Sequence, residues 1–219
     1  MDITGLIFDF DGTLLDTETP IYEEWAEEYR RHGQELTIAL WGETIGTHGK
    51  IDLAVRLTEL AEEALDPEAR REAVRDRIRA RLEHQALRRG VREMVEAARG
   101  AGLRTAIASS STSNWVGEWV ERHDIGGLFD HICGRDHVTE VKPSPELFLL
   151  AAEKLELAPQ QCVVFEDSPN GVLAAQRAGM RCVAVPNGVT RRLSIPEVEL
   201  RIDSFAGLTL ENILARLAD

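Results

Sequence analysis

Cysteine is scarce in this sequence, as are aromatic side chains and long hydrophobic runs. The three cysteines, Cys133, Cys162 and Cys182, are odd in number and have no metal-ligand spacing, which favours buried free thiols over a disulfide framework. Aromatic residues make up 5% of the chain, which argues against a sandwich of aromatic-rich strands. No segment reaches the roughly 18–20 apolar residues that a membrane-spanning helix needs.

Basic residues are also few relative to acidic ones: 25 Lys and Arg stand against 38 Asp and Glu, a net charge of −13. Binding to nucleic acid or to anionic membranes is not expected, because both depend on basic surfaces. The N-terminus has no basic start, and Asp9 and Asp11 interrupt its apolar stretch, unlike a signal peptide. We therefore expect a cytoplasmic protein. The lack of an exposed apolar heptad pattern favours a monomer.

The sequence does contain short apolar runs that alternate with amphipathic helical patterns. Five runs have the character of buried strands: Gly5–Phe10, Arg104–Ala108, His131–Cys133, Cys162–Phe165 and Arg181–Val185. Helices are expected at Val91–Gly100, Asn114–His123, Pro145–Leu155, Pro169–Ala178 and Leu208–Leu217. This alternation is typical of βαβ units. It predicts an α/β fold with a Rossmann-like parallel sheet.

About 70 mostly helical residues interrupt this pattern directly after the first strand. We expect helices at Ile21–His32 with Thr19 as N-cap, at about Ile51–Ala64 and at Pro67–Leu87, with a glycine-rich loop at Trp41–Lys50. The last of these helices interleaves Arg with Glu and Asp, which favours a solvated surface. The sequence thus predicts a core domain from residues 1–16 and 90–219 and an inserted α-helical cap domain from residues 17–89.

Reactive side chains gather in four short segments at predicted strand ends. They are Asp9 with Asp11, Ser109 with Ser110, Lys142, and Glu166 with Asp167. In open α/β sheets, ligands bind outside the carboxyl ends of the strands. Acids placed together repel unless a cation relieves them, and oxygen ligands suit Mg²⁺. Because lysine and serine can hold phosphate oxygens, the segments predict a Mg²⁺ site beside a phosphate clamp.

The motifs DFDGTLLDTE, ASSS, VKPSPE and VFEDSPNG, in this order, resemble the haloacid dehalogenase-like superfamily. Within it, the chain is similar to the phosphatase and β-phosphoglucomutase-like branch, which carries a helical cap after the first strand. The motifs span residues 8 to 171. The resemblance implies that Asp9 is the nucleophile and a Mg²⁺ ligand. It implies that Asp11 is the general acid and base, and that the Asp11 carbonyl is a further Mg²⁺ ligand.

The same resemblance assigns the other motif residues. Ser109 and Lys142, with Ser110 beside them, match the phosphate-binding positions, and Glu166 and Asp167 match the acids of the Mg²⁺ site. The implied activity is Mg²⁺-dependent hydrolysis of a small phosphorylated metabolite through an aspartyl-phosphate. Dehalogenation is disfavoured, because that group needs no metal and lacks the second aspartate. A non-enzymatic sensor is disfavoured because all the motif acids are present.

A sugar-phosphate mutase remains the alternative activity. Mutase-like relatives carry a histidine in the first cap helix, where this chain has Ile21 and Tyr22. Substrate contacts are expected in the cap loop.

The candidates for these substrate contacts are Trp41, His48 and Lys50, although His48 is equally consistent with a solvated turn. Trp115 and Trp119 are four residues apart, a spacing that predicts core packing.

Overall fold

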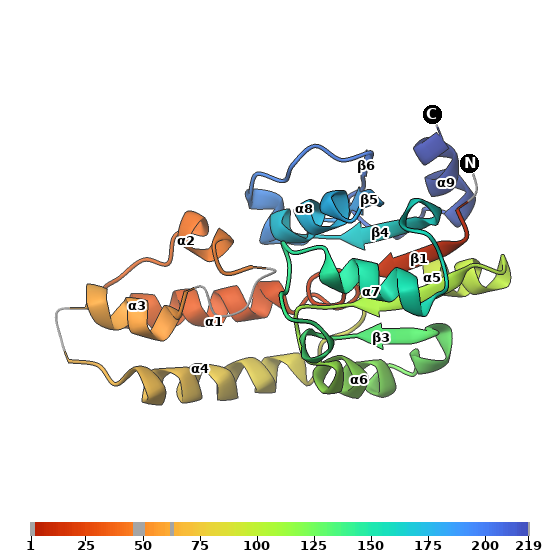
Figure 1. Ribbon diagram of the computed structural model, residues 1–219. Coiled ribbons are helices and arrows are strands. Elements are labelled where there is room, and N and C mark those ends of the chain that lie inside the picture. Colours follow the sequence, from red (N-terminus) through yellow and green to blue (C-terminus); the bar gives the residue numbers. More distant parts are fainter. Residues whose placement is uncertain (1–2, 46–50, 62–63, 219) are drawn as a thin grey trace.

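The chain folds around one parallel sheet. The structure, a computed structural model, describes residues 3–45, 51–61 and 64–218. Within them, six strands lie in the order β3-β2-β1-β4-β5-β6 (Figure 1). The strands are β1 (Gly5–Phe8), β2 (Arg104–Ala108), β3 (His131–Cys133), β4 (Cys162–Glu166), β5 (Arg181–Ala184) and β6 (Leu200–Arg201). The predicted α/β fold is confirmed; β6 was missed because two residues leave no pattern.

Helices cover both faces of this sheet. They are α5 (Val91–Gly100), α6 (Ser113–Arg122), α7 (Glu146–Lys154), α8 (Pro169–Arg177) and α9 (Leu210–Ala218). Successive residues of a strand point to opposite faces. Accordingly, Leu6 and Phe8 pack in one apolar cluster with α5, α6 and α9, whereas Ile7 packs in another with α7 and α8. Each face of the sheet therefore has its own buried core.

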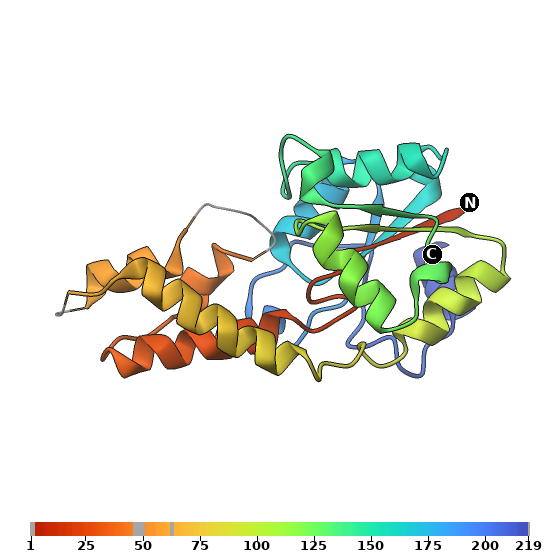
Figure 2. The same ribbon diagram turned by 90° about the horizontal axis from the view of Figure 1, so that it is seen from below.

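The helices inserted after β1 lie beyond the carboxyl ends of the strands (Figures 1 and 2). They are α1 (Glu18–Arg31), α2 (Ile38–Gly42), α3 (Leu53–Leu60) and α4 (Pro67–Leu82). These helices have a separate apolar cluster that includes Trp25, Tyr29, Trp41, Leu57 and Val74. Among the described residues, no helix is both long enough and apolar enough to cross a membrane.

Three details of this helical region differ from the prediction. The first helix begins at Glu18 rather than after Thr19, because the Asp16 carboxylate accepts the Thr19 amide at 3.1 Å. The first two residues of the predicted loop, Trp41 and Gly42, instead form the end of α2, whose start is capped by the Thr37 hydroxyl accepting the Leu40 amide. Helix α4 ends five residues early, because Leu87 pairs with Leu15 as the chain returns to the core.

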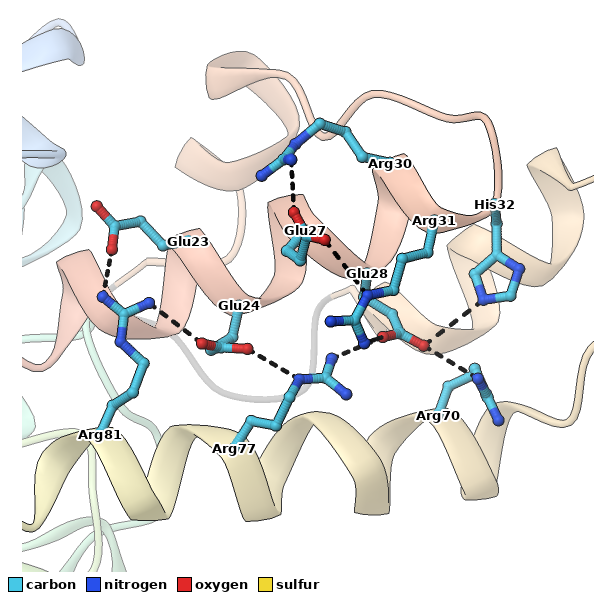
Figure 3. A network of polar contacts seen from close by, with 10 residues as sticks. All are labelled: Glu23, Glu24, Glu27, Glu28, Arg30, Arg31, His32, Arg70, Arg77 and Arg81. Carbon is cyan, nitrogen blue, oxygen red and sulfur yellow. Dashed lines mark hydrogen bonds and ion pairs between the residues drawn. The ribbon is translucent and has the colours of Figure 1, made fainter.

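The Arg-rich helix α4 is not simply a solvated surface, which corrects the prediction. Three of its arginines, Arg70, Arg77 and Arg81, face acidic residues of α1 (Figure 3). Arg77 contacts Glu24 and Glu28, and Arg81 contacts Glu23 and Glu24. The partners in these ion pairs are about fifty residues apart in sequence. The spacing of charges within α4 therefore could not predict which acids its arginines contact.

Candidate active site

Parallel register brings the predicted site residues to one edge of the sheet. Phe8 of β1 is paired with Ile107 of β2 and with Phe165 of β4. The residues that follow these three positions therefore emerge together at the carboxyl edge. Asp9 follows β1 directly, and its amide donates to the Phe165 carbonyl at 2.9 Å.

Three buried carboxylates gather at this edge: Asp9, Glu166 and Asp167 each offer an oxygen, and these oxygens all lie within 4.8 Å of one another. The Glu166 carboxylate accepts from the amide and the hydroxyl of Ser168, at 2.8 and 3.0 Å. The Asp167 carboxylate accepts from the Asn187 side-chain amide at 2.7 Å. The acids are thus held in place by the surrounding protein.

Lys142 is the buried cation beside this cluster. Its Nζ donates to Asp9 Oδ1 at 2.5 Å and to Glu166 Oε1 at 2.7 Å, and it lies 4.8 Å from the centre of the Phe148 ring. Burial alone would lower the pKa of Lys142, but the charges of Asp9 and Glu166 overcome it and raise that pKa. Lys142 therefore remains an ammonium group.

One lysine does not neutralise three acids. Burial raises the pKa of Asp9 to about 8 despite the opposing charge of Lys142, and the charge of Glu166 adds to the increase. Burial and the charge of Glu166 likewise raise the pKa of Asp167 well above its usual range. Asp9 Oδ2 is buried and has no hydrogen-bond partner among the described residues. Uncompensated carboxylate oxygens of this kind fit a divalent cation such as Mg²⁺.

Asp11 lies next to the cluster but is held differently. Its Oδ1 accepts from the Thr17 hydroxyl and from the Trp115 indole, both at 3.1 Å. Its Oδ2 accepts from the hydroxyls of Ser109 and Ser111, at 3.1 and 2.7 Å. Among the described residues, four donors from three segments of the chain therefore fix this carboxyl group.

A cavity of about 190 Å³ opens over these groups. The core contributes the acids Asp9, Asp11, Glu166 and Asp167, together with Ser109 to Ser111. The helical region contributes Glu18, Ile21, Thr44 and Ile45. A ligand in this cavity would contact both parts of the molecule.

The comparison with protein families agrees with this geometry. The sequence model of haloacid dehalogenase-like hydrolases matches residues 3–179. The chain belongs to this family. A Bacillus subtilis (strain 168) protein named "Putative phosphatase YhcW" is 41% identical over 215 residues, which cover 98% of each chain. Fructose-1-phosphate phosphatase YqaB of Escherichia coli (strain K12) is 34% identical over 188 residues, covering 83% of this chain and 95% of the relative.

A solved structure of the same family shares the fold. The crystal structure of CbbY from Rhodobacter sphaeroides in complex with phosphate superposes with a TM-score of 0.75 and 29% sequence identity, covering 96% of this chain and 98% of CbbY. The haloacid dehalogenase-like resemblance drawn from the four motifs is therefore confirmed.

The predicted site residues of the core lie together at this edge of the sheet. Of the three predicted contacts in the cap, Trp41 is among the described residues. Ser110 lines the cavity over the acids with Ser109. Trp41 is buried, with 3% of its surface exposed, and lines a neighbouring cavity of about 460 Å³. His48 and Lys50 lie outside the described residues. The neighbouring cavity shares Glu18, Ile21 and Thr44 with the cavity over the acids.

Several residues at the site are not predicted by the sequence analysis. Glu18 lines the cavity, and burial followed by the charges of Asp11 and Asp9 raises its pKa well above the usual range. Arg135 also lines the cavity and follows strand β3. Its place could have been found by applying the strand-end rule to this strand. The spacing of Trp115 predicts core packing, and its ring does pack against the core, but its indole nitrogen also donates to Asp11.

Proposed function

We propose that this chain is a Mg²⁺-dependent phosphatase that hydrolyses a small phosphorylated metabolite through an aspartyl-phosphate. The observation that carries the proposal is the buried cluster of Asp9, Glu166 and Asp167, paired with Lys142. Asp11, the second aspartate of the first motif, lines the same cavity as this cluster. A carboxylate nucleophile beside a separate proton donor is the arrangement that covalent catalysis of phosphate transfer requires.

The proposed reaction has two displacements. A carboxylate oxygen of Asp9 forms a bond to phosphorus while the bond from phosphorus to the ester oxygen breaks, and Asp11 gives its proton to that oxygen. Asp11 then takes a proton from a water molecule, whose oxygen attacks phosphorus and releases Asp9. Each displacement avoids a free alkoxide or hydroxide, because the proton moves to or from Asp11.

The other residues hold the phosphoryl group. Lys142, Ser109 and Ser110 are proposed to bind its oxygens, the lysine by charge and the serines by hydrogen bonds. Asp9, Glu166 and Asp167, with the Asp11 carbonyl, are the proposed ligands of Mg²⁺. When bound, Mg²⁺ supplies positive charge that stabilises the phosphoryl group and allows the acids to stay ionised.

The substrate is proposed to be a phosphorylated sugar. Support comes from the name of the Escherichia coli relative, a fructose-1-phosphate phosphatase, and from the small volume of the catalytic cavity. The helical domain, residues 17–89, is the proposed cap that selects the substrate. Trp41, His48 and Lys50 are its proposed contacts, with Trp41 acting from the neighbouring cavity.

Hydrolysis is favoured over mutase activity by one residue of the cavity. Ile21 lies near the position where mutase-like relatives carry a histidine, and its side chain lines the catalytic cavity. An aliphatic group there offers no acid or base to a returning sugar hydroxyl.

The decisive experiment measures phosphate release from a panel of sugar phosphates with and without Mg²⁺. We expect Asp9→Asn to lower kcat by at least about a thousandfold, because the nucleophile is lost. Asp203→Asn, the same change at an exposed acid after β6, serves as the control and keeps full activity. Wild-type rates in Asp9→Asn would overturn the proposal. Interconversion of glucose 1-phosphate and glucose 6-phosphate without phosphate release would show a mutase instead.

A further inference from the structure

Trp115 makes a polar contact that its place on a packed helix face does not require. It lies in the first turn of α6, and its indole Nε1 donates to Asp11 Oδ1 at 3.1 Å. The two residues are 104 positions apart in sequence. The contact therefore depends on the tertiary fold and joins α6 to the loop that carries the proposed proton donor.

The Trp115 ring is held by its neighbours. Its plane meets that of Trp119 at 67°, with 5.6 Å between the ring centres, and Arg122 covers the Trp119 ring at 5.0 Å. Trp115 lines the catalytic cavity and also a second cavity of about 490 Å³ between α4 and α6. The indole thus forms part of the wall between the two, with its nitrogen directed to Asp11.

The indole of Trp115 differs in chemistry from the three hydroxyl donors that the described residues offer to Asp11. The hydroxyls of Thr17, Ser109 and Ser111 rotate, and each can accept a hydrogen bond as well as donate one. An indole N–H only donates, and a packed ring cannot turn to offer anything else. A carboxyl group held by hydroxyls alone has several equivalent arrangements, whereas the indole bond selects one of them.

We propose that Trp115 is a positioning residue that fixes the orientation of the Asp11 carboxyl group for proton transfer to the leaving group. This inference rests on the proposed phosphatase function. The neutral indole of Trp115 does not stabilise the charge of the phosphoryl group. Losing its hydrogen bond to Asp11 should therefore slow only the step in which Asp11 protonates the leaving group. Esters with poor leaving groups depend on that proton, and esters with stabilised leaving groups depend on it much less.

The test compares two substrates and two variants. Trp115→Phe keeps a packed ring and removes the N–H, and Trp119→Phe makes the same change one turn later, away from Asp11. The substrates are fructose 1-phosphate, an alkyl ester, and p-nitrophenyl phosphate, whose leaving group is a stabilised anion. The value compared is kcat/KM, which reports the steps up to loss of the leaving group.

We expect Trp115→Phe to lower kcat/KM for fructose 1-phosphate by about 10- to 30-fold, the effect of one hydrogen bond to a charged group. For p-nitrophenyl phosphate we expect a loss of less than about threefold, and for Trp119→Phe little change with either ester. Equal losses with both esters, or no loss with either, would overturn the inference. Absence of turnover of both esters by the wild-type enzyme would count against the phosphatase proposal instead.

A second measurement tests the contact without any turnover. The chain has four tryptophans, and each gives one indole N–H signal in a ¹H–¹⁵N spectrum. The Trp115 signal is the one missing in Trp115→Phe. We expect Asp11→Asn to shift this signal more than the other three, because it removes the charge that the N–H faces. A shift no larger than that of the Trp119 signal would contradict the proposed pairing.

Discussion

Glu28 of α1 and Arg77 of α4 form an ion pair of 2.6 Å between Oε2 and Nη2, and 1% of the Glu28 side chain is exposed. Arg70 reaches the other carboxylate oxygen at 3.2 Å (Figure 3). Burial alone would raise the pKa of Glu28, but hydrogen bonds and charges from Arg77, followed by Arg70, outweigh it and lower the pKa below its usual value of 4.5. The pair therefore couples α1 to α4 through a buried, ionised acid.

Glu28→Gln should lower the free energy of unfolding by about 2 kcal/mol at neutral pH, because it removes a buried charge-assisted contact. Since folding lowers the pKa of Glu28, the contribution of Glu28 to stability is fully present above the unfolded-state pKa. It is lost as the pH falls through the folded-state pKa. Urea unfolding at neutral pH and below pH 4.5 should therefore show the gap between wild type and variant shrinking in acid.

The matched control is Glu27→Gln, at the neighbouring position of α1. Glu27 pairs with Arg30 and Arg31 on the surface, where 37% of its side chain is exposed. Exposed pairs contribute little, and we expect a change within about 0.5 kcal/mol. Similar losses in both variants would show that the charges of α1 act through general electrostatics rather than through the buried pair.

The sequence could predict what depends on local pattern and on strand ends. The positions of Asp9, Ser109 and Glu166 are predictable because parallel register brings the ends of three neighbouring strands to one edge. The partners of Trp115 and Arg77 could not be found in this way. Helical spacing shows which face of a helix is buried, but it does not show which atom of a side chain meets a polar group from a distant segment.

Mg²⁺ should stabilise the folded protein, because the cation relieves repulsion among Asp9, Glu166 and Asp167. At a Mg²⁺ concentration of one hundred times Kd, the free energy of unfolding should increase by about 2.7 kcal/mol. Asp167→Asn should lose most of this increase, whereas Asp203→Asn should retain it. Thermal unfolding with Mg²⁺ and with EDTA measures the difference. An equal shift in both variants would remove Asp167 from the proposed ligand set.

Lys142→Met should destabilise the protein without Mg²⁺ by about 3 kcal/mol, because two buried acids lose their cation. Methionine has a similar length and leaves no large cavity. Added Mg²⁺ should recover part of the lost stability but not the activity, since the phosphate also loses its proposed lysine contact. Denaturant titrations with and without Mg²⁺, beside phosphate-release assays, check both statements. Full activity in this variant would exclude Lys142 from phosphate binding.

Gly171 lies in the first turn of α8, against the Glu166 carboxylate. A Cβ atom at this position would lie 1.7 Å from Glu166 Oε1, so Gly171→Ala must displace the acid that contacts Lys142 and Ser168. We expect this variant to lose at least about tenfold in kcat and about 2 kcal/mol in the free energy of unfolding.

Gly117→Ala in α6 is the matched substitution, because a Cβ atom there meets nothing within 4 Å. Alanine has a higher helix propensity than glycine, so this variant should gain about 0.5–1 kcal/mol in the free energy of unfolding and keep its activity. A loss of unfolding free energy in Gly171→Ala together with a gain in Gly117→Ala would show that the loss comes from displacement of Glu166 and not from alanine itself. Unchanged activity in Gly171→Ala would show that the Glu166 carboxylate can move without harm to catalysis, and would remove it from the metal site.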